Sequence, residues 1–253
     1  IKILIILLIY NSYNESYYIL YKMNNLLLLR HGQSQWNKER RFTGWVDIDL
    51  TEQGKYEAEQ AGKLIKNLNI EFDAFFTSQL KRAINTLEIV LKVLNKTDAK
   101  ISKTHSLNER HYGELTSLNK DETIKKYGYK QVKIWRRSYE ISPPPMEEKH
   151  PYKNKVNTNI LSESLKDTFD RVIPYYKKEI EPLISSNKNI LIVFHGNSCR
   201  ALLMKIFNIS KKKIAKFEIP TGNPLLIRFK DDLKVQDYKY LDSKRAKKIL
   251  FNV

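Results

Sequence analysis

The sequence predicts an α/β fold. Two observations lead to this prediction: short, fully apolar runs at residues 26–29 and 190–194, and segments between them in which apolar residues recur at helical spacing. Each of the two runs ends in a histidine followed by a glycine. A chain of 253 residues can bury a sizeable core. No linker interrupts the sequence, so we expect one large domain.

The first half of the chain predicts two strands and two helices. Residues 26–29 form an apolar run of strand length, and residues 72–77 read as a second strand. Thr51 can cap a helix that lies between them. The second helix is the clearest, because its apolar residues form one stripe: Leu80, Ala83, Ile84, Leu87, Val90, Leu91 and Leu94.

The second half predicts a short helix, a loop, a long helix and three strands. Asn119 with Glu122 resembles a capping box, and Gly128 can end the helix that follows. Prolines at 143–145 indicate a loop to about residue 159. Ser164 begins a long helix, in which Pro174 predicts a kink. The strands are expected at residues 190–194, 225–229 and 235–240, with a turn between the last two.

The domain limits follow from the same pattern. Met23 stands directly before the first strand, so we expect it to be the natural start and residues 1–22 to be an extension of doubtful status. A weak targeting signal is the alternative. The apolar stretch at 1–9 is too short to span a bilayer. Residues 23–253 then form a single domain, with an insertion at about 110–160 that covers one end of the sheet.

The charge balance is strongly basic, with a formal net charge of +17. The lysines are spread along the chain without a dense basic block, which favours a solvated surface over a nucleic-acid site. A basic surface also attracts small anionic substrates. The single cysteine, Cys199, excludes a disulfide framework and suits a reducing cytoplasm. No membrane or metal partner is indicated.

Two histidines occupy matching positions in the sequence. "LLLLRHG" and "ILIVFHGNS" both read as a buried strand, a histidine, a glycine and a polar turn. Ligands of open α/β sheets bind beyond the carboxyl ends of the strands, where His31 and His195 are expected. Each histidine alone could be a core residue, but the repeated pattern favours a functional pair. An imidazole there can attack phosphorus, and its partner can transfer protons or stabilise charge.

Charged residues near other predicted element ends could complete such a site. Arginines bind phosphoryl groups through paired hydrogen bonds, and Arg30 and Arg82 are the candidates. Glu109, beside Arg110, lies in a loop after a strand and could act as general acid or base. Arg136 and Arg137 are adjacent in a helix, so a shared ligand has to lie near the helix end. Each of these residues could equally be an ordinary surface or loop residue.

Several longer segments resemble one family. "LRHGQSQWNKERRFTGWVDIDLTEQG", "TSQLKRAINT", "LNERHYGEL", "LNKDET", "QVKIWRRS", "FHGNSCRAL" and "IPTGNPL" are similar to the cofactor-dependent phosphoglycerate mutases of the histidine phosphatase superfamily. The resemblance runs from about residue 25 to 240. It implies a three-layer α/β/α sandwich with a mostly parallel central sheet. Ser117 stands where close relatives usually carry glycine.

The resemblance also implies a reaction and the residues that perform it. The reaction is the interconversion of 3-phosphoglycerate and 2-phosphoglycerate in glycolysis, primed by 2,3-bisphosphoglycerate and needing no metal. His31 becomes the phosphohistidine nucleophile, Glu109 the proton donor and acceptor, and His195, Arg30 and Arg82 the groups that stabilise the phosphoryl group. Substrate contacts are implied for Ser34, Asn37, Thr43, Gly44, Arg110, Tyr112, Lys120, Arg136, Arg137, Gly196 and Asn197. A homodimer or a dimer-based tetramer in the cytoplasm is implied.

Other function classes remain as alternatives. A phosphatase or bisphosphoglycerate mutase of the same superfamily would use the same histidines, with water or bisphosphoglycerate chemistry in place of isomerisation. A basic nucleic-acid-binding protein is a distant alternative, since no recognised motif is present. His105, His111 and His150 lack metal-ligand spacing, and the sequence contains no P-loop and no dinucleotide fingerprint. Ser198 lacks the flanking glycines of a nucleophile elbow.

Overall fold

The computed structural model describes residues 24–156 and 158–246. The predicted extension at residues 1–22 and the expected start at Met23 lie outside the described residues. Among the described helices, none is both long enough and apolar enough to cross a membrane.

A mixed sheet forms the centre of the described chain. Its strands are β1 (Asn24–Arg30), β2 (Ala74–Thr77), β3 (Ile101–Lys103), β4 (Ile190–Phe194), β5 (Leu225–Phe229) and β6 (Val235–Tyr240). Their order is β3-β2-β4-β1-β5-β6. The first four strands in this order run parallel, whereas β5 is antiparallel to β1 and β6 is antiparallel to β5. The predicted mostly parallel sheet is confirmed.

The leucine run of β1 is apolar throughout because both faces of the sheet are covered. Leu26 and Leu28 pack into one core, whereas Leu27 and Leu29 pack into the other. This alternation follows from the two-residue period of a strand. All four side chains are buried. Burial on two faces is what makes a parallel strand a continuous hydrophobic run.

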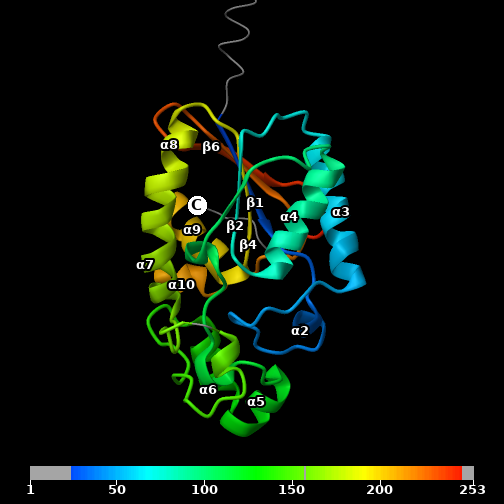
Figure 1. The fold of residues 1–253 in the computed structure, drawn as a ribbon. Coiled ribbons are helices and arrows are strands. Elements are labelled where there is room, and N and C mark those ends of the chain that lie inside the picture. Colours follow the sequence, from blue (N-terminus) through cyan, green and yellow to red (C-terminus); the bar gives the residue numbers. More distant parts are fainter. Residues whose placement is uncertain (1–23, 157, 247–253) are drawn as a thin grey trace, which may run out of the picture.

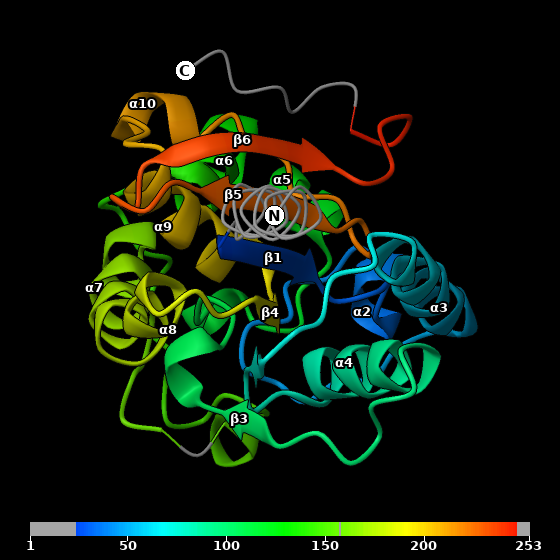
Figure 2. The same cartoon turned by 90° about the horizontal axis from the view of Figure 1, so that it is seen from above.

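Helices on both faces complete the three layers (Figure 2). One face is covered by α3 (Glu52–Lys66) and α4 (Lys81–Val93), and the other by α7 (Leu165–Tyr175), α8 (Glu181–Ser185) and α9 (Gly196–Ile206). Thr51 caps α3, since its side chain accepts a hydrogen bond from the Gly54 N–H at 3.0 Å. The predicted sandwich and its main helices are therefore confirmed.

The long helix expected after Ser164 is confirmed as a continuous helical run over residues 165–185 that contains one irregular turn. Ser164 does begin a helix with a capping box, but α7 ends at Tyr175. A π-helical turn at Tyr176–Ile180 follows, and then α8. Pro174 lies in the last turn of α7 and has no N–H to donate, so the regular hydrogen-bond ladder cannot continue unchanged.

The remaining elements are short. They are α2 (Gln35–Lys38), α5 (Lys120–Tyr127), α6 (Tyr129–Arg137), α10 (Lys211–Ile214) and the 3-10 turns η1 (His105–Leu107), η2 (Gly113–Leu115) and η3 (Lys153–Lys155). Asn119 caps α5, and Gly128 ends it as predicted, with φ +79°. Figure 1 shows α5 and α6 beyond one end of the sheet. The interpretation of residues 110–160 as an insertion in a single domain stays a prediction.

Candidate active site

The two histidines of the repeated pattern meet beyond the carboxyl ends of adjacent strands. Strands β1 and β4 are parallel neighbours, and Arg30 is in register with Phe194. The next residues, His31 and His195, therefore leave the sheet side by side. Their ring centroids are 5.0 Å apart with an interplanar angle of 60°. Both rings are buried.

Hydrogen bonding decides which nitrogen of His31 is available. Nδ1 lies 2.7 Å from the Gly32 carbonyl oxygen, which only accepts, so Nδ1 carries the proton. The lone pair of Nε2 is then free for chemistry. Burial lowers the pKa of His31 well below its ordinary value, and the nearby Arg82 and Arg30 lower it further. His31 is thus a neutral imidazole near pH 7.

Gly32 allows this arrangement because it leaves no room for a side chain. A Cβ at Gly32 would lie 2.1 Å from the Gly54 carbonyl oxygen. The Gly32 N–H donates to Thr86 Oγ1 at 3.1 Å. The loop after β1 is therefore pressed against the start of α3 and held by α4.

His195 is oriented from the neighbouring strand. Its Nε2 lies 2.7 Å from Ser78 Oγ, directly after β2. Its Nδ1 is buried without a hydrogen-bond partner within the described part of the chain. Burial, followed by Arg82 and His31, lowers the pKa of His195 well below its ordinary value. Nδ1 is thus the ring nitrogen whose hydrogen-bonding capacity is not used by the described residues.

Two arginines are held rigidly by backbone carbonyl groups. Arg82 donates to Val46 O at 3.0 Å and to Gly44 O at 2.8 Å, and Arg30 donates to Ile219 O at 2.6 Å. The Nε atoms of both arginines are buried without a partner among the described residues. Burial lowers the pKa of Arg82 to about 10, which still leaves a cation at pH 7.

Thr43 Oγ1 is a further buried polar atom that has no described partner. Native proteins rarely leave such groups unpaired, since each costs desolvation free energy. Together with Arg30 Nε, Arg82 Nε and His195 Nδ1, it belongs to the surroundings of His31. This set fits an anion with several oxygens, such as a phosphoryl group.

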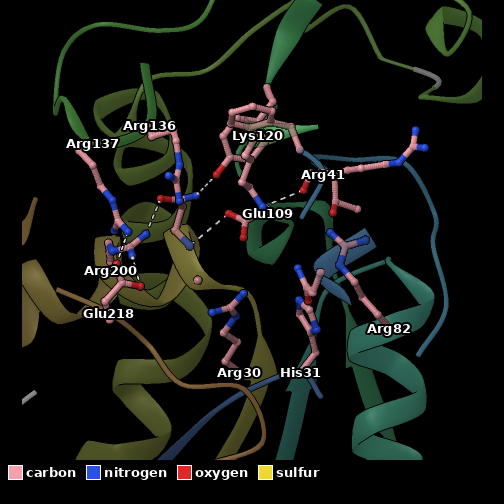
Figure 3. Close-up of a pocket in the computed structure, with 16 residues that line it drawn as sticks. Arg30, His31, Arg41, Arg82, Glu109, Lys120, Arg136, Arg137, Arg200 and Glu218 are labelled. Atoms are coloured by element: carbon pink, nitrogen blue, oxygen red, sulfur yellow. Dashed lines mark hydrogen bonds and ion pairs between the residues drawn. The ribbon is translucent and has the colours of Figure 1, made fainter. Parts of the chain in front are cut away.

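Glu109 is buried opposite His31 (Figure 3). Its carboxylate accepts hydrogen bonds from the backbone N–H groups of Arg110 at 2.8 Å and Asn197 at 3.1 Å. Burial raises the pKa of Glu109, but these N–H groups and the charges of Arg30 and Arg82 outweigh it, so the net pKa lies below the ordinary value. Glu109 is therefore ionised and can accept a proton.

The lining of the pocket is strongly cationic. Its charged lining residues are Arg30, Arg41, Arg82, Lys120, Arg136, Arg137 and Arg200, against the carboxylates of Glu109 and Glu218. Burial lowers the pKa of Lys120 to about 8. Although burial raises the pKa of Tyr112, Arg110 and other nearby cations bring it down to about 8. The pocket is thus suited to a small molecule that is anionic at more than one point.

Most of the predicted site residues line this pocket. These are Arg30, His31, Asn37, Thr43, Arg82, Glu109, Tyr112, Lys120, Arg136, Arg137, Gly196 and Asn197.

Four predicted residues are not among the lining residues. Ser34 caps α2 and is hydrogen-bonded to Asn37. Gly44, with φ +56°, offers its carbonyl oxygen to Arg82. Arg110 is fully buried, with its guanidinium 4.7 Å from the centre of the Tyr112 ring. His195 is fully buried behind His31.

Sequence reasoning missed four lining residues: Arg41, Phe42, Arg200 and Glu218. Arg41 and Phe42 lie within the first quoted segment and Arg200 within "FHGNSCRAL", so the segments contained them without a sign of their function. Arg200 bonds to Asn197 Oδ1 at 2.9 Å and to the Phe217 carbonyl oxygen. Glu218 forms an ion pair with Arg137. No local pattern distinguishes these residues, because tertiary contacts alone bring them to the pocket.

Comparison with known proteins gives consistent results. Residues 26–238 match the profile of the histidine phosphatase superfamily (branch 1). The chain is 50% identical over 225 residues to the 2,3-bisphosphoglycerate-dependent phosphoglycerate mutase of Xylella fastidiosa (strain M12), with 85% of this chain and 90% of the relative covered. The protein of the same name from Pelagibacter ubique (strain HTCC1062) is 47% identical to this chain over 237 residues, with 90% of this chain and 99% of the relative covered.

Solved structures with lower identity share the fold. The α-ribazole phosphatase from Shigella flexneri aligns with a TM-score of 0.67 at 19% identity, covering 90% of this chain and 100% of that one. A mycobacterial glucosyl-3-phosphoglycerate phosphatase in complex with VO3 aligns with a TM-score of 0.65 at 20% identity, covering 85% and 96%. At such identities these likenesses describe the architecture only.

Proposed function

We propose that this protein interconverts 3-phosphoglycerate and 2-phosphoglycerate through a phosphohistidine at His31. The chain belongs to the 2,3-bisphosphoglycerate-dependent phosphoglycerate mutases of the histidine phosphatase superfamily. One observation carries the proposal. The free Nε2 of a neutral His31 faces a cationic pocket in which unpaired donors surround it. Such a site favours nucleophilic attack on phosphorus.

The reaction divides into two balanced transfers. With His31 carrying the phosphoryl group, a glycerate hydroxyl attacks phosphorus and its proton passes to the Glu109 carboxylate, while the N–P bond breaks and Nε2 regains its lone pair. In the second transfer Nε2 attacks the other phosphoryl group of the bound molecule. That P–O bond breaks, and the leaving oxygen takes the proton from Glu109. Arg30, Arg82 and His195 stabilise the transferring group.

The pocket fits the primer that the relatives' name implies. Bound 2,3-bisphosphoglycerate supplies the phosphoryl group that His31 carries between turnovers. Arg30 and Arg82 would hold the phosphoryl group at His31, and Lys120, Arg136 and Arg137 would hold the other anionic end. Asn37 and Asn197 also line the pocket. Among the described residues no acidic, histidine or cysteine cluster is arranged to hold a metal.

The finer assignments are also proposals. The curated relatives have the name of a glycolytic enzyme, so we propose a cytoplasmic location and a homodimer or dimer-based tetramer. We further propose that residues 23–253 form a single domain with an insertion at about 110–160.

His31→Ala tests the proposed function. We expect it to abolish both isomerisation of 3-phosphoglycerate and acid-labile labelling by 2,3-bisphosphoglycerate, because no other group can take the phosphoryl group. A coupled spectrophotometric assay and a labelling experiment measure the two. The control is His105→Ala, which changes an exposed histidine. Retained isomerisation in His31→Ala would contradict the mechanism, and phosphate release without isomerisation in the wild type would favour the phosphatase alternative.

A further inference from the structure

The segment that carries Glu109 is irregular backbone inside the protein. It lies between η1 and η2, and Asn108, Glu109, Arg110 and His111 are all buried. Buried backbone outside helices and strands needs hydrogen bonds from elsewhere. The Glu109 carboxylate depends on this backbone, because it accepts the Arg110 N–H.

The hydrogen bonds come from an ion pair between Arg171, within α7, and Glu163, just before that helix. Arg171 donates from Nε to Glu163 Oε1 at 2.6 Å and from Nη2 to Oε2 at 3.0 Å. The same guanidinium donates to the carbonyl oxygens of Ser106 and Glu109, both at 2.9 Å. The side chains of Glu163 and Arg171 are only 3% and 13% exposed. The pair is therefore built into the interior, unlike the exposed ion pairs on the surface.

One peptide group connects this pair to the Glu109 carboxylate. The carbonyl of Glu109 accepts from Arg171 and from Trp45 Nε1. The N–H of the same peptide group is that of Arg110, which donates to the carboxylate. Because the peptide group is planar, fixing its carbonyl also fixes the direction of its N–H.

The pair holds the next peptide as well. Glu163 Oε2 accepts the His111 N–H at 2.8 Å. The Arg171 guanidinium also lies 5.5 Å from the centre of the Trp45 ring. The ion pair thus binds the backbone of residues 109–111 at two points, the Glu109 carbonyl oxygen and the His111 N–H.

We propose that Arg171 and Glu163 are positioning residues for Glu109, which hold the 109–110 peptide so that the carboxylate reaches the substrate oxygen. This inference rests on the proposed role of Glu109 in proton transfer. The bond changes are those already given: as the P–O bond breaks, the leaving oxygen takes the proton from Glu109. A displaced carboxylate slows this proton transfer and leaves attack by His31 intact.

The test uses conservative variants, because removing one partner of a buried pair leaves an uncompensated charge. Arg171→Lys keeps the charge opposite Glu163, but one ammonium group cannot reproduce the planar fork that reaches Glu163, Ser106 and Glu109 together. Glu163→Gln keeps an acceptor for the His111 N–H. Arg228→Lys is the matched control, since Arg228 forms a partly buried ion pair with Asp237 between β5 and β6.

The measurement compares two leaving groups. Hydrolysis of 3-phosphoglycerate and of glycerol phosphate requires a proton on the leaving alkoxide, whereas p-nitrophenyl phosphate releases a stable phenolate without one. We expect Arg171→Lys to lower kcat/KM for the alkyl esters by roughly 10- to 100-fold, within the range of general acid catalysis, because kcat/KM reports the step in which the ester leaving group departs. For the nitrophenyl ester we expect a loss of less than about threefold, with KM nearly unchanged, and Arg228→Lys to alter neither.

Equal losses for both ester classes, or no loss for the alkyl esters, overturns the positioning role. Titration of the Glu109 carboxyl by isotope-edited NMR gives a second readout that needs no turnover. Arg171→Lys should raise the pKa of Glu109, since the Arg110 N–H no longer points at it, and an unchanged pKa contradicts the proposal. If the wild type hydrolyses esters without isomerising phosphoglycerate, the proposed mutase function fails and the leaving-group comparison still decides this inference.

Discussion

Single hydrogen bonds decide the chemistry of the two central side chains. The Gly32 carbonyl oxygen holds the proton on His31 Nδ1, so that the opposite nitrogen is nucleophilic. Ser78 holds Nε2 of His195, and Nδ1 of that ring is left without a partner among the described residues. Within the described chain the two imidazoles therefore keep different nitrogens uncommitted, Nε2 in His31 and Nδ1 in His195.

The Lys120 side chain predicts how substrate binding depends on pH. Its pKa is lowered to about 8, chiefly by burial, so the ammonium loses its charge as the pH rises through 8. Loss of this cation weakens binding of an anionic substrate. We expect KM for 3-phosphoglycerate to rise by up to about tenfold between pH 8 and pH 9.

The variants Lys120→Arg and Tyr112→Phe separate the two groups that titrate in this range. The guanidinium stays charged, so Lys120→Arg should flatten the rise in KM. Tyr112 has a pKa of about 8 and gains a negative charge, so Tyr112→Phe should remove any part of the rise that it causes. A KM that still rises as steeply as in the wild type in the double variant Lys120→Arg/Tyr112→Phe argues against titration of either group.

At the scale of elements, the connection between η2 and α5 is strained at one residue. Ser117 has φ +71°, in the left-handed region that favours glycine. The sequence resemblance expects glycine at this position. Its N–H donates to the Phe42 carbonyl oxygen at 2.8 Å, and its own carbonyl oxygen accepts from Arg41 at 3.2 Å. These contacts hold a conformation that serine disfavours.

Ser117→Gly should therefore stabilise the protein. The left-handed conformation costs a residue with a Cβ about 1–2 kcal/mol, and part of the gain is offset because glycine has more freedom when unfolded. We expect a net increase of about 0.5–1 kcal/mol in the free energy of unfolding, measured by urea denaturation. Ser117→Ala keeps the Cβ and serves as the comparison. A glycine variant no more stable than the alanine variant excludes strain at this residue.

For the whole molecule, the buried histidines make stability depend on pH. The pKa values of His31 and His195 lie well below 6.5 in the folded state, mainly because of burial. His111 is also lowered, to about 4, mainly by burial. Below pH 6.5 the unfolded chain binds more protons than the folded one, so stability falls as the pH falls.

We expect the free energy of unfolding to decrease between pH 7 and pH 5. Each buried histidine contributes a slope of at most about 1.4 kcal/mol per pH unit below 6.5. The variant His31→Gln/His195→Gln should show a flatter decrease over the same range, measured by urea denaturation at each pH. A decrease as steep as that of the wild type assigns the pH dependence to other groups.

Sequence patterns predicted the elements that are long or buried on both sides. The runs in β1 and β4 had to be apolar because helices cover both faces of the sheet. Thr51 and Ser164 marked the starts of α3 and α7 correctly. Short elements such as α2 and α10 carry too few residues to show a period. The π-turn inside the helical run after Ser164 was not predicted, because a π-turn leaves the apolar spacing unchanged.

The sequence by itself determined the fold class, the strands that end in His31 and His195, and most of the pocket lining. The fold class and the strands follow from local periodicity and from residue order along each strand, whereas most of the pocket lining was implied by the resemblance to the mutase family. Only the tertiary structure decided that Arg200, Arg41 and Glu218 line the pocket, and that Arg171 and Glu163 hold the backbone of Glu109. The physical reason is that these contacts join segments far apart in the chain, so strand pairing and helix packing create them without a local pattern.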